Sequence, residues 1–159
     1  MKIDLTAEQL DYATFLPALS GFYATYVGKQ RYDEYVDKAR IPACFANGVE
    51  SLNYLNKNEG QFQYKWTLYS AGHAELDTNK HAPKEDMIRN RDRANTWVLG
   101  DSGGFQIGKG VWEGDWKDPN CPKAQKKRDG VLRWMDAYMD YGMVLDIPAW
   151  VARSPEGVK

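Results

Sequence analysis

The stretch Trp97-Val98-Leu99-Gly100-Asp101 decides the fold class of this chain. It is short and apolar and follows a helical pattern, which is typical of a parallel strand buried on both faces. A second stretch of the same character, Met143-Val144-Leu145-Asp146, follows after another helical pattern. Helices that alternate with strands of this kind predict an α/β fold with a parallel sheet.

Each of these predicted strands runs directly into a carboxylate. Asp101 and Asp146 are 45 residues apart, which accommodates a βαβ unit of about 30 or more residues with the helix after Pro122 as its crossover. Because such strands are parallel, we expect both acids at the C-terminal edge of the sheet, where α/β folds bind ligands and place catalytic residues. The alternative is that each Asp only caps the turn that follows it.

A pair of glycines follows the first acid, with an aromatic ring and an amide directly after it. The run is Asp101-Ser102-Gly103-Gly104-Phe105-Gln106. The glycines let the backbone approach a planar ligand closely, because neither carries a Cβ. The ring could stack on that ligand, and the amide could bond its edge. The Gly-x-Gly-x-x-Gly and Walker patterns are absent from the sequence, so a nucleotide-phosphate loop is not favoured.

The other elements are predicted from helical periodicity, capping residues and apolar–polar alternation. The predicted helices cover residues 6–15, 17–28, 47–56, 83–95 and a stretch that begins at Pro122, and a further strand covers residues 62–68. We expect the loop that carries Trp112 and Trp116 to be exposed. Its two rings would either stack on bases or cover an edge of the core.

Composition and charge limit the class of protein. The chain has 159 residues, of which 43% are hydrophobic and 13% aromatic, enough for a packed single domain. Its net charge of −1 creates no global field that would attract a polyanion. Any polyanion site must therefore be local, although a solvated helix face is the alternative for each basic cluster. The two clusters are Arg89, Arg91 and Arg93, and Lys123, Lys126, Lys127 and Arg128.

Cysteine usage and hydropathy point to a reduced, non-membrane setting. Cys44 and Cys121 form no Cys-x-x-Cys pair, so the sequence predicts neither a zinc site nor a disulfide framework. No stretch approaches the ~20 apolar residues that a membrane helix needs. We expect a cytoplasmic protein.

The run from Asp101 to Gln106 resembles the signature of the tRNA-guanine transglycosylases. The stretch from Met143 to Asp146 resembles the strand ending in Asp that follows one βα unit later in that family. Leu145-Asp146-Ile147-Pro148, with Trp134-Met135-Asp136 upstream, is similar to the branch of phages and genomic islands that inserts 7-deazaguanines into DNA. The tRNA branch usually has an acidic residue directly after that Asp, where this chain has Ile147.

The resemblance implies a pentosyltransferase that exchanges guanine for a 7-deazaguanine in DNA or tRNA, in a bacterium or a phage-infected host cell. An enzyme carboxylate attacks the sugar C1′, guanine leaves, and the deazaguanine replaces it on the covalent intermediate. In this chain Asp101 would be the general acid/base, and a buried Asp146 would accept hydrogen bonds from the amidine edge of the base. Ser102 and the glycine pair would line the pocket, Phe105 would stack on the base, and Gln106 would complete the substrate site.

The same resemblance implies a (β/α)₈ barrel, which needs about 250 residues. We therefore expect residues 1–159 to be a single domain that forms the first half of a TIM-type barrel, preceded by a helical N-terminal region. The covalent nucleophile and the zinc site of the family would lie beyond Lys159, so no cofactor or metal is expected within this chain. Exposed strand edges would favour a homodimer or the docking of the missing C-terminal half.

Two other functions stay open. The half-barrel could bind nucleic acid, a base or a partner subunit without turnover. The string Gly100-Asp101-Ser102-Gly103-Gly104 also surrounds the nucleophilic serine of chymotrypsin-like proteases. His73, however, lies only 29 residues before Ser102, which leaves no room for the first β-barrel of such a protease. Phe105 also stands where those enzymes usually have Pro.

Overall fold

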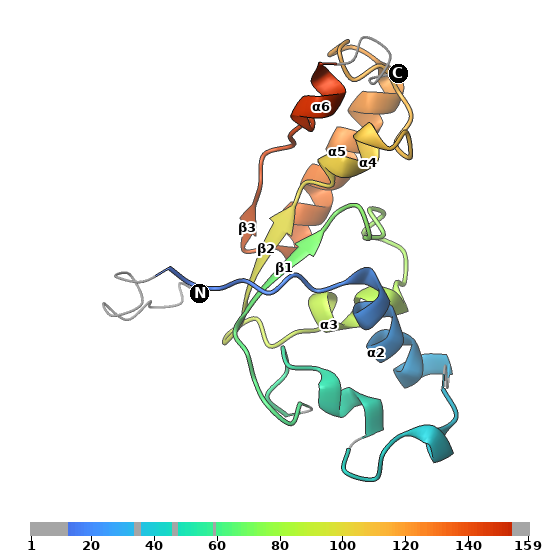
Figure 1. Cartoon of the computed structure of the whole chain (residues 1–159), viewed down its shortest axis with the longest axis vertical. Coiled ribbons are helices and arrows are strands. Elements are labelled where there is room, and N and C mark those ends of the chain that lie inside the picture. The colour runs from blue at the N-terminus through green and yellow to red at the C-terminus, as the bar shows by residue number, and fades with distance from the viewer. Residues whose placement is uncertain (1–12, 34–35, 46–47, 59, 154–159) are drawn as a thin grey trace. The chain divides into compact units, whose positions relative to one another are not determined.

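The fold is described from a computed structural model, which covers residues 13–33, 36–45, 48–58 and 60–153. The described part is mixed α/β and contains a three-stranded parallel sheet in the order β1-β2-β3 (Figure 1). The strands are β1 (Trp66–Ser70), β2 (Trp97–Asp101) and β3 (Tyr141–Gly142). The predicted α/β class, its parallel sheet and the strand at residues 97–99 are confirmed.

The helices are unevenly long. The two longest are α2 (Gly21–Asp33) and α5 (Pro122–Tyr138), and the shorter ones are η1 (Lys38–Arg40), η2 (Gly48–Leu52), η3 (Pro83–Glu85), α3 (Asp86–Arg89), α4 (Gly104–Gly108) and α6 (Ala149–Ala152). None of the helices in the described ranges is both long and apolar enough to cross a membrane.

The chain divides into two compact units. Unit 1 comprises Met1–Leu68 and His81–Leu99, and unit 2 comprises Tyr69–Lys80 and Gly100–Lys159. The boundary passes through β1 and β2, so each unit holds a part of each of these strands. Every residue of the run from Asp101 to Gln106, and Asp146 with it, belongs to unit 2.

In unit 1 the predicted helix end at Gly28 is wrong, because α2 continues to Asp33. The reason lies in a distant part of the sequence. A Cβ built on Gly28 would overlap the carbonyl oxygen of Pro83, so the glycine lets α2 pack directly against the backbone of η3. The helix also begins later than predicted, since Ala18 forms a parallel bridge with Leu68 before the first turn.

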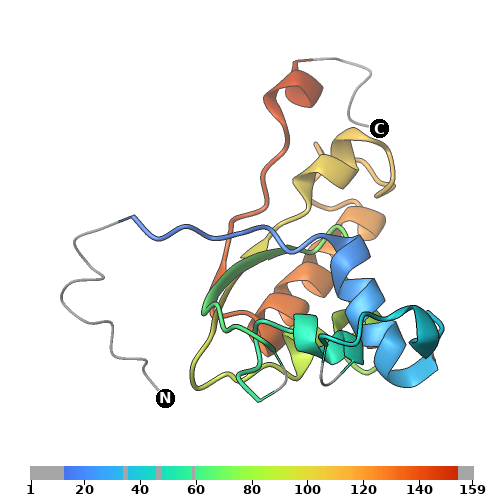
Figure 2. The ribbon, with the colours of Figure 1, turned by 60° about the horizontal axis from the view of Figure 1, so that its bottom comes forward.

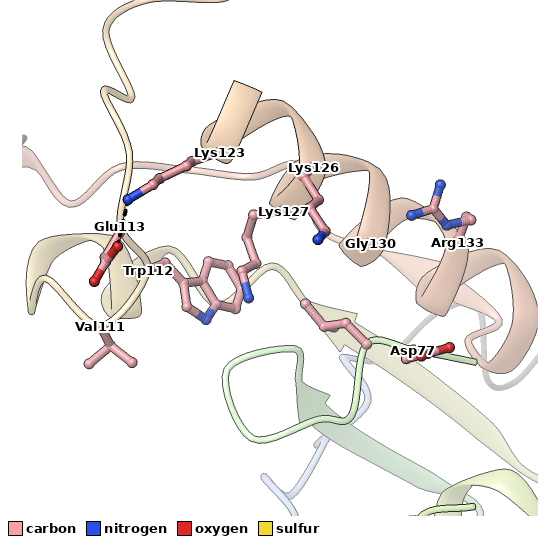
Figure 3. A pocket seen from close by; sticks show the side chains of 10 residues that line it. Asp77, Val111, Trp112, Glu113, Lys123, Lys126, Lys127, Gly130 and Arg133 are labelled. Atoms are coloured by element: carbon pink, nitrogen blue, oxygen red, sulfur yellow. Dashed lines mark hydrogen bonds and ion pairs between the residues drawn. The ribbon is translucent and has the colours of Figure 1, made fainter. Parts of the chain in front are cut away.

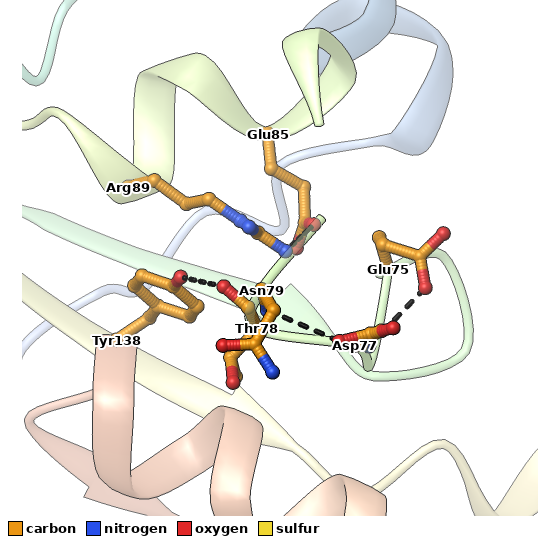
Figure 4. Close-up of polar contacts among 7 residues, drawn as sticks. All are labelled: Glu75, Asp77, Thr78, Asn79, Glu85, Arg89 and Tyr138. Carbon is orange, nitrogen blue, oxygen red and sulfur yellow. Dashed lines mark hydrogen bonds and ion pairs between the residues drawn. The ribbon is translucent and has the colours of Figure 1, made fainter. Parts of the chain in front are cut away.

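The predicted helix over residues 83–95 is shorter, since α3 ends at Arg89. Its two acids, Glu85 and Asp86, are buried at 0% and 4% exposure. Arg89 pairs with Glu85 at 2.9 Å (Figure 4), and Arg31 pairs with Asp86. Buried charges need such partners, because an unpaired ion is costly to remove from water.

This burial also removes most of the first basic cluster from the surface. Arg89 is held by Glu85, and Arg91 is 5% exposed and donates to the Ile88 carbonyl. Of the three predicted cluster members, only Arg93 is exposed. Both interpretations of this cluster, a solvated helix face and a polyanion surface, are therefore wrong for Arg89 and Arg91.

Three other predicted elements are displaced. The strand predicted over residues 62–68 lies at Trp66–Ser70, and the helix predicted over residues 47–56 is the 3-10 turn Gly48–Leu52. The predicted helix at residues 6–15 falls largely outside the described residues, and its described part, residues 13–15, is not helical.

The strand predicted at residues 143–145 is also wrong. The paired residues are Tyr141–Gly142, and after the Met143 amide donates to the Gly100 carbonyl at 2.8 Å the chain leaves the sheet. Figures 1 and 2 show an extended segment from there to α6. Met143 and Val144 are 46% and 89% exposed, because β3 is the last strand of the described sheet and nothing covers its outer side there.

In unit 2 the helix predicted from Pro122 is confirmed as α5. Its Trp134 is fully buried and packs against the ring of Tyr69, with centroids 6.0 Å apart. Trp112 and Trp116 stack on each other at 6.3 Å and are each only 7% exposed. The loop itself is exposed at Glu113 and Asp115 as predicted, and the burial of its two rings supports the interpretation that they cover an edge of the core rather than stack on bases.

Hydrogen bonds hold the loop that follows β1 in unit 2. Tyr138 on α5 donates from its hydroxyl to the Thr78 carbonyl at 3.3 Å (Figure 4). Within the loop, the Asp77 carboxylate accepts from the Asn79 amide at 3.1 Å, and the Asp77 amide donates to Glu75 at 3.2 Å. These bonds hold the loop that carries Leu76 and Asp77 in place beside α5.

Gly28 in α2 and Gly130 in α5 provide a matched pair of substitutions, because a Cβ has no room at the first position and ordinary room at the second. Gly130→Ala should stabilise the protein by about 0.5–1 kcal/mol, because alanine favours a helix interior over glycine and the new Cβ would meet Leu76 at an ordinary 3.6 Å. Gly28→Ala should destabilise it by about 1–3 kcal/mol, because its Cβ has no room. Denaturant unfolding followed by circular dichroism measures both. A Gly28→Ala protein as stable as the parent would contradict the packing of α2 on η3, and a destabilised Gly130→Ala protein would contradict the room beside Leu76.

Candidate functional site

The end of β2 and the segment after β3 meet in unit 2. The hydroxyl of Ser102, which is fully buried, donates to Oδ1 of Asp146 at 3.0 Å. A Cβ built on Gly104 would overlap the Asp146 carbonyl and lie 2.9 Å from Oδ1. The predicted neighbours Ser102, Gly104 and Asp146 therefore lie together, and glycine is required at 104 for the segment to come this close.

The two acids differ from their predicted environments. Asp146 is exposed rather than buried, because the chain has already left the sheet when it reaches this residue. Asp101 is half-buried at the end of β2, and its carbonyl accepts from the Ala71 amide at 2.9 Å. A ligand could therefore reach Asp146 directly from solvent, whereas Asp101 is partly screened.

Gly103, the residue before α4, has a left-handed backbone conformation. Gly103 has φ +75°, and a Cβ there would come within 2.7 Å of both the Gly72 nitrogen and the Trp112 ring. An L side chain is thus opposed by backbone conformation and by space. Gly103 therefore shapes the turn that carries the chain from Ser102 into the helix.

Gln106 has a structural position in unit 2. Its side-chain amide packs on Gly72, leaving no room for a Cβ there. Its carbonyl accepts from the amides of Val111 and Trp112 at 2.9 and 3.2 Å. The predicted contact between this amide and a ligand would require Gln106 to leave Gly72.

Phe105 is exposed and has two neighbours that the sequence analysis missed. Phe105 and Trp150 are 56% and 55% exposed, and their rings meet edge to face with centroids 6.5 Å apart. Lys109 places its Nζ 5.3 Å from the centre of the Phe105 ring. A signal was present in the sequence, since Trp150 stands four residues after Asp146 and Lys109 four after Phe105, one turn along α4.

This arrangement offers a defined set of interactions. The Asp146 carboxylate is an acceptor with lone pairs beyond the one used by Ser102, and Phe105 and Trp150 supply aromatic surface. A planar heterocycle that carries N–H donors on one edge matches both features. No group of three or more His, Cys, Asp or Glu side chains in the described ranges could hold a metal ion.

Cys121 lies outside this cluster, but its surroundings change the acidity of its thiol. It occupies the position before α5, and the Asp115 amide donates to its Sγ at 3.2 Å. Backbone N–H groups of Ala124 and Asp115 hold the pKa of the Cys121 thiol below its ordinary value, because they stabilise the thiolate.

The lowered pKa predicts faster alkylation of Cys121 at neutral pH. In a Cys44→Ser variant, the pH midpoint for reaction with iodoacetamide should lie below the midpoint of the same protein in urea, where the N–H donors are lost. Mass spectrometry of the alkylated peptide measures both rates, and Cys121→Ser provides the background. Equal native and unfolded midpoints would contradict the N–H···S contacts.

Comparisons of the chain with models of protein families, with characterised proteins and with solved structures found no match. The chemical assignment of the site therefore rests on the chain's own residues. Its central features are the hydrogen bond from Ser102 to Asp146, the close approach of Gly104, and the exposed rings of Phe105 and Trp150.

Proposed function

We propose that unit 2 carries the base-binding site of a transglycosylase that replaces guanine by a 7-deazaguanine in DNA or tRNA. The observation that carries the proposal is the hydrogen bond from buried Ser102 to exposed Asp146, held beside Gly104. In this proposal the described α/β part belongs to the first half of a TIM-type barrel.

Guanine and 7-deazaguanine share the edge that such a site would recognise. Both present N–H donors at N1 and at the exocyclic amine, and a carboxylate is an acceptor-only partner for them. The Ser102 bond orients one oxygen of Asp146 and leaves the other for the base. The faces of Phe105 and Trp150 add stacking, worth about 1–3 kcal/mol per base.

The proposed exchange assigns Asp101 to proton transfer. As the bond between C1′ and the base breaks, its electron pair goes to the leaving nitrogen, which needs a proton. The position of Asp101 at the end of β2, directly before Ser102, suits this role, because a proton donor must lie within hydrogen-bond reach of the leaving base. The carboxylate that attacks C1′ is a different residue in this proposal, since both acids described here serve the base.

A binding module without turnover is the second candidate. The same assignment favours it, because Asp101 and Asp146 both address the base and neither is left to attack the sugar. The serine protease alternative has less support. Ser102 is fully buried and its hydroxyl donates to Asp146, whereas a serine nucleophile needs an accessible hydroxyl and a histidine base.

The role of Asp146 can be tested with free bases. Asp146→Asn should weaken guanine binding about tenfold, because the amide replaces one acceptor by a donor and the exposed position lessens the cost of the mismatch. Titration calorimetry measures the affinity, with Asp129→Asn as a matched control on the exposed face of α5. Adenine, whose N1 is an acceptor, should not lose affinity in the variant, because the Asn amide can donate to it where the carboxylate cannot. Equal guanine affinity in both proteins would remove Asp146 from the site.

Turnover is tested by incorporation of labelled guanine into DNA and into tRNA. The 159-residue chain should bind the base without exchanging it, because both acids of the proposed site, Asp101 and Asp146, are assigned to the base and not to the sugar. Exchange by this chain would show that one of its own acids attacks the sugar, and Asp101→Asn would then identify it. Exchange by a longer or two-chain form would separate the enzyme from the binding module.

A further inference from the structure

A groove of about 430 Å³ lies along α5 in unit 2 (Figure 3). One wall is a single face of that helix, and the opposite side is formed by loop residues that include Leu76 and Trp112. The helix face presents Lys123, Lys126, Lys127, Gly130 and Arg133. Their spacing of three and four residues places these side chains in one row.

Positive charge exceeds negative charge in this groove. Four cations line it, against the two acids Glu113 and Asp77. Glu113 pairs with Lys123 at 2.8 Å on an exposed surface. An ion pair in such a position contributes little to the free energy of folding. Asp77 is already the acceptor of the Asn79 amide.

The remaining cations are available to a ligand. Lys126, Lys127 and Arg133 form no ion pair within the ranges that the structure describes. Lys127 instead lies over the Trp112 ring, 5.1 Å from its centre, which holds the ammonium group beside the groove. Figure 3 shows the amines of Lys126 and Lys127 directed away from α5 toward the facing loops.

The dimensions favour an extended anion. Lys123 and Arg133 are ten residues apart, which is about 15 Å along a helix. Gly130 adds no side chain to the middle of the row, between Lys127 and Arg133. Phosphates recur about every 3.4 Å along one strand of DNA, so this row spans several of them.

We propose that this groove binds the phosphate backbone of a nucleic-acid strand. The inference rests on the proposed function for the choice of ligand, because a base-exchanging or base-binding unit must hold the strand that bears its base. The charge row would supply affinity that is independent of sequence, while Asp146 and Phe105 read the base. The groove is concave, with the α5 side chains on one side and Leu76 and Trp112 on the other, which suits a strand better than a flat anionic membrane.

Fluorescence anisotropy with labelled single-stranded DNA and RNA of identical sequence tests the proposal. The double variant Lys126→Glu/Arg133→Glu should weaken binding at least tenfold at low salt. It should also reduce the slope of log K against log salt by about 1.4, at about 0.7 per lost phosphate contact. The control Lys57→Glu/Arg93→Glu makes the same charge change at exposed positions of unit 1 and should change affinity less than threefold.

Equal losses in the two double variants would show an effect of net charge and overturn the proposal, as would no loss in either. Loss of binding to phosphatidylserine vesicles with unchanged oligonucleotide affinity would assign the groove to a membrane instead. Guanine calorimetry separates this proposal from the previous one. Groove variants that lose the oligonucleotide should retain binding of free guanine, so either proposal can fail alone.

Discussion

The approach of the Asp146 backbone to Gly104 is the contact on which the candidate site depends. Any side chain at position 104 would occupy the space of the Asp146 carbonyl. Without this approach Ser102 could not donate to the Asp146 carboxylate, and the segment that carries Trp150 would not lie along Phe105. A steric condition at one position thus determines whether a polar contact and an aromatic contact form at all.

Charge has opposite consequences in the two units, although the sequence presents similar clusters of basic residues. Arg89 in unit 1 forms an internal ion pair with the buried carboxylate of Glu85. Lys126 and Arg133 in unit 2 face a groove with too few acids to neutralise them. What separates a structural arginine from a binding cation is the charge of its spatial neighbours, which local sequence does not report.

The elements predicted correctly are those whose structure is determined by neighbouring residues in the sequence. The strand at Trp97–Asp101 and the helix at Pro122–Tyr138 follow from a short apolar run and from helical periodicity. The errors concern contacts between distant residues. Gly28 continues a helix because Pro83 lies against it, and Val144 is exposed because no further described strand covers β3. In the site, the pairing of the glycine run with Asp146 was predicted, whereas the exposure of Asp146 was not.

The exposure of Asp146 changes how the site would select a base. A buried acid imposes its desolvation cost before any ligand arrives, but an exposed one stays hydrated until a base covers it. A base that offers two N–H donors replaces the lost water contacts, whereas a base that offers an acceptor leaves the carboxylate both dehydrated and unpaired. Stacking on Phe105 would provide the cover, so recognition of the edge and of the face would be coupled. Selectivity would then depend on how completely the base excludes water, and Lys109, whose ammonium group lies over the Phe105 ring, would compete with the base for that ring.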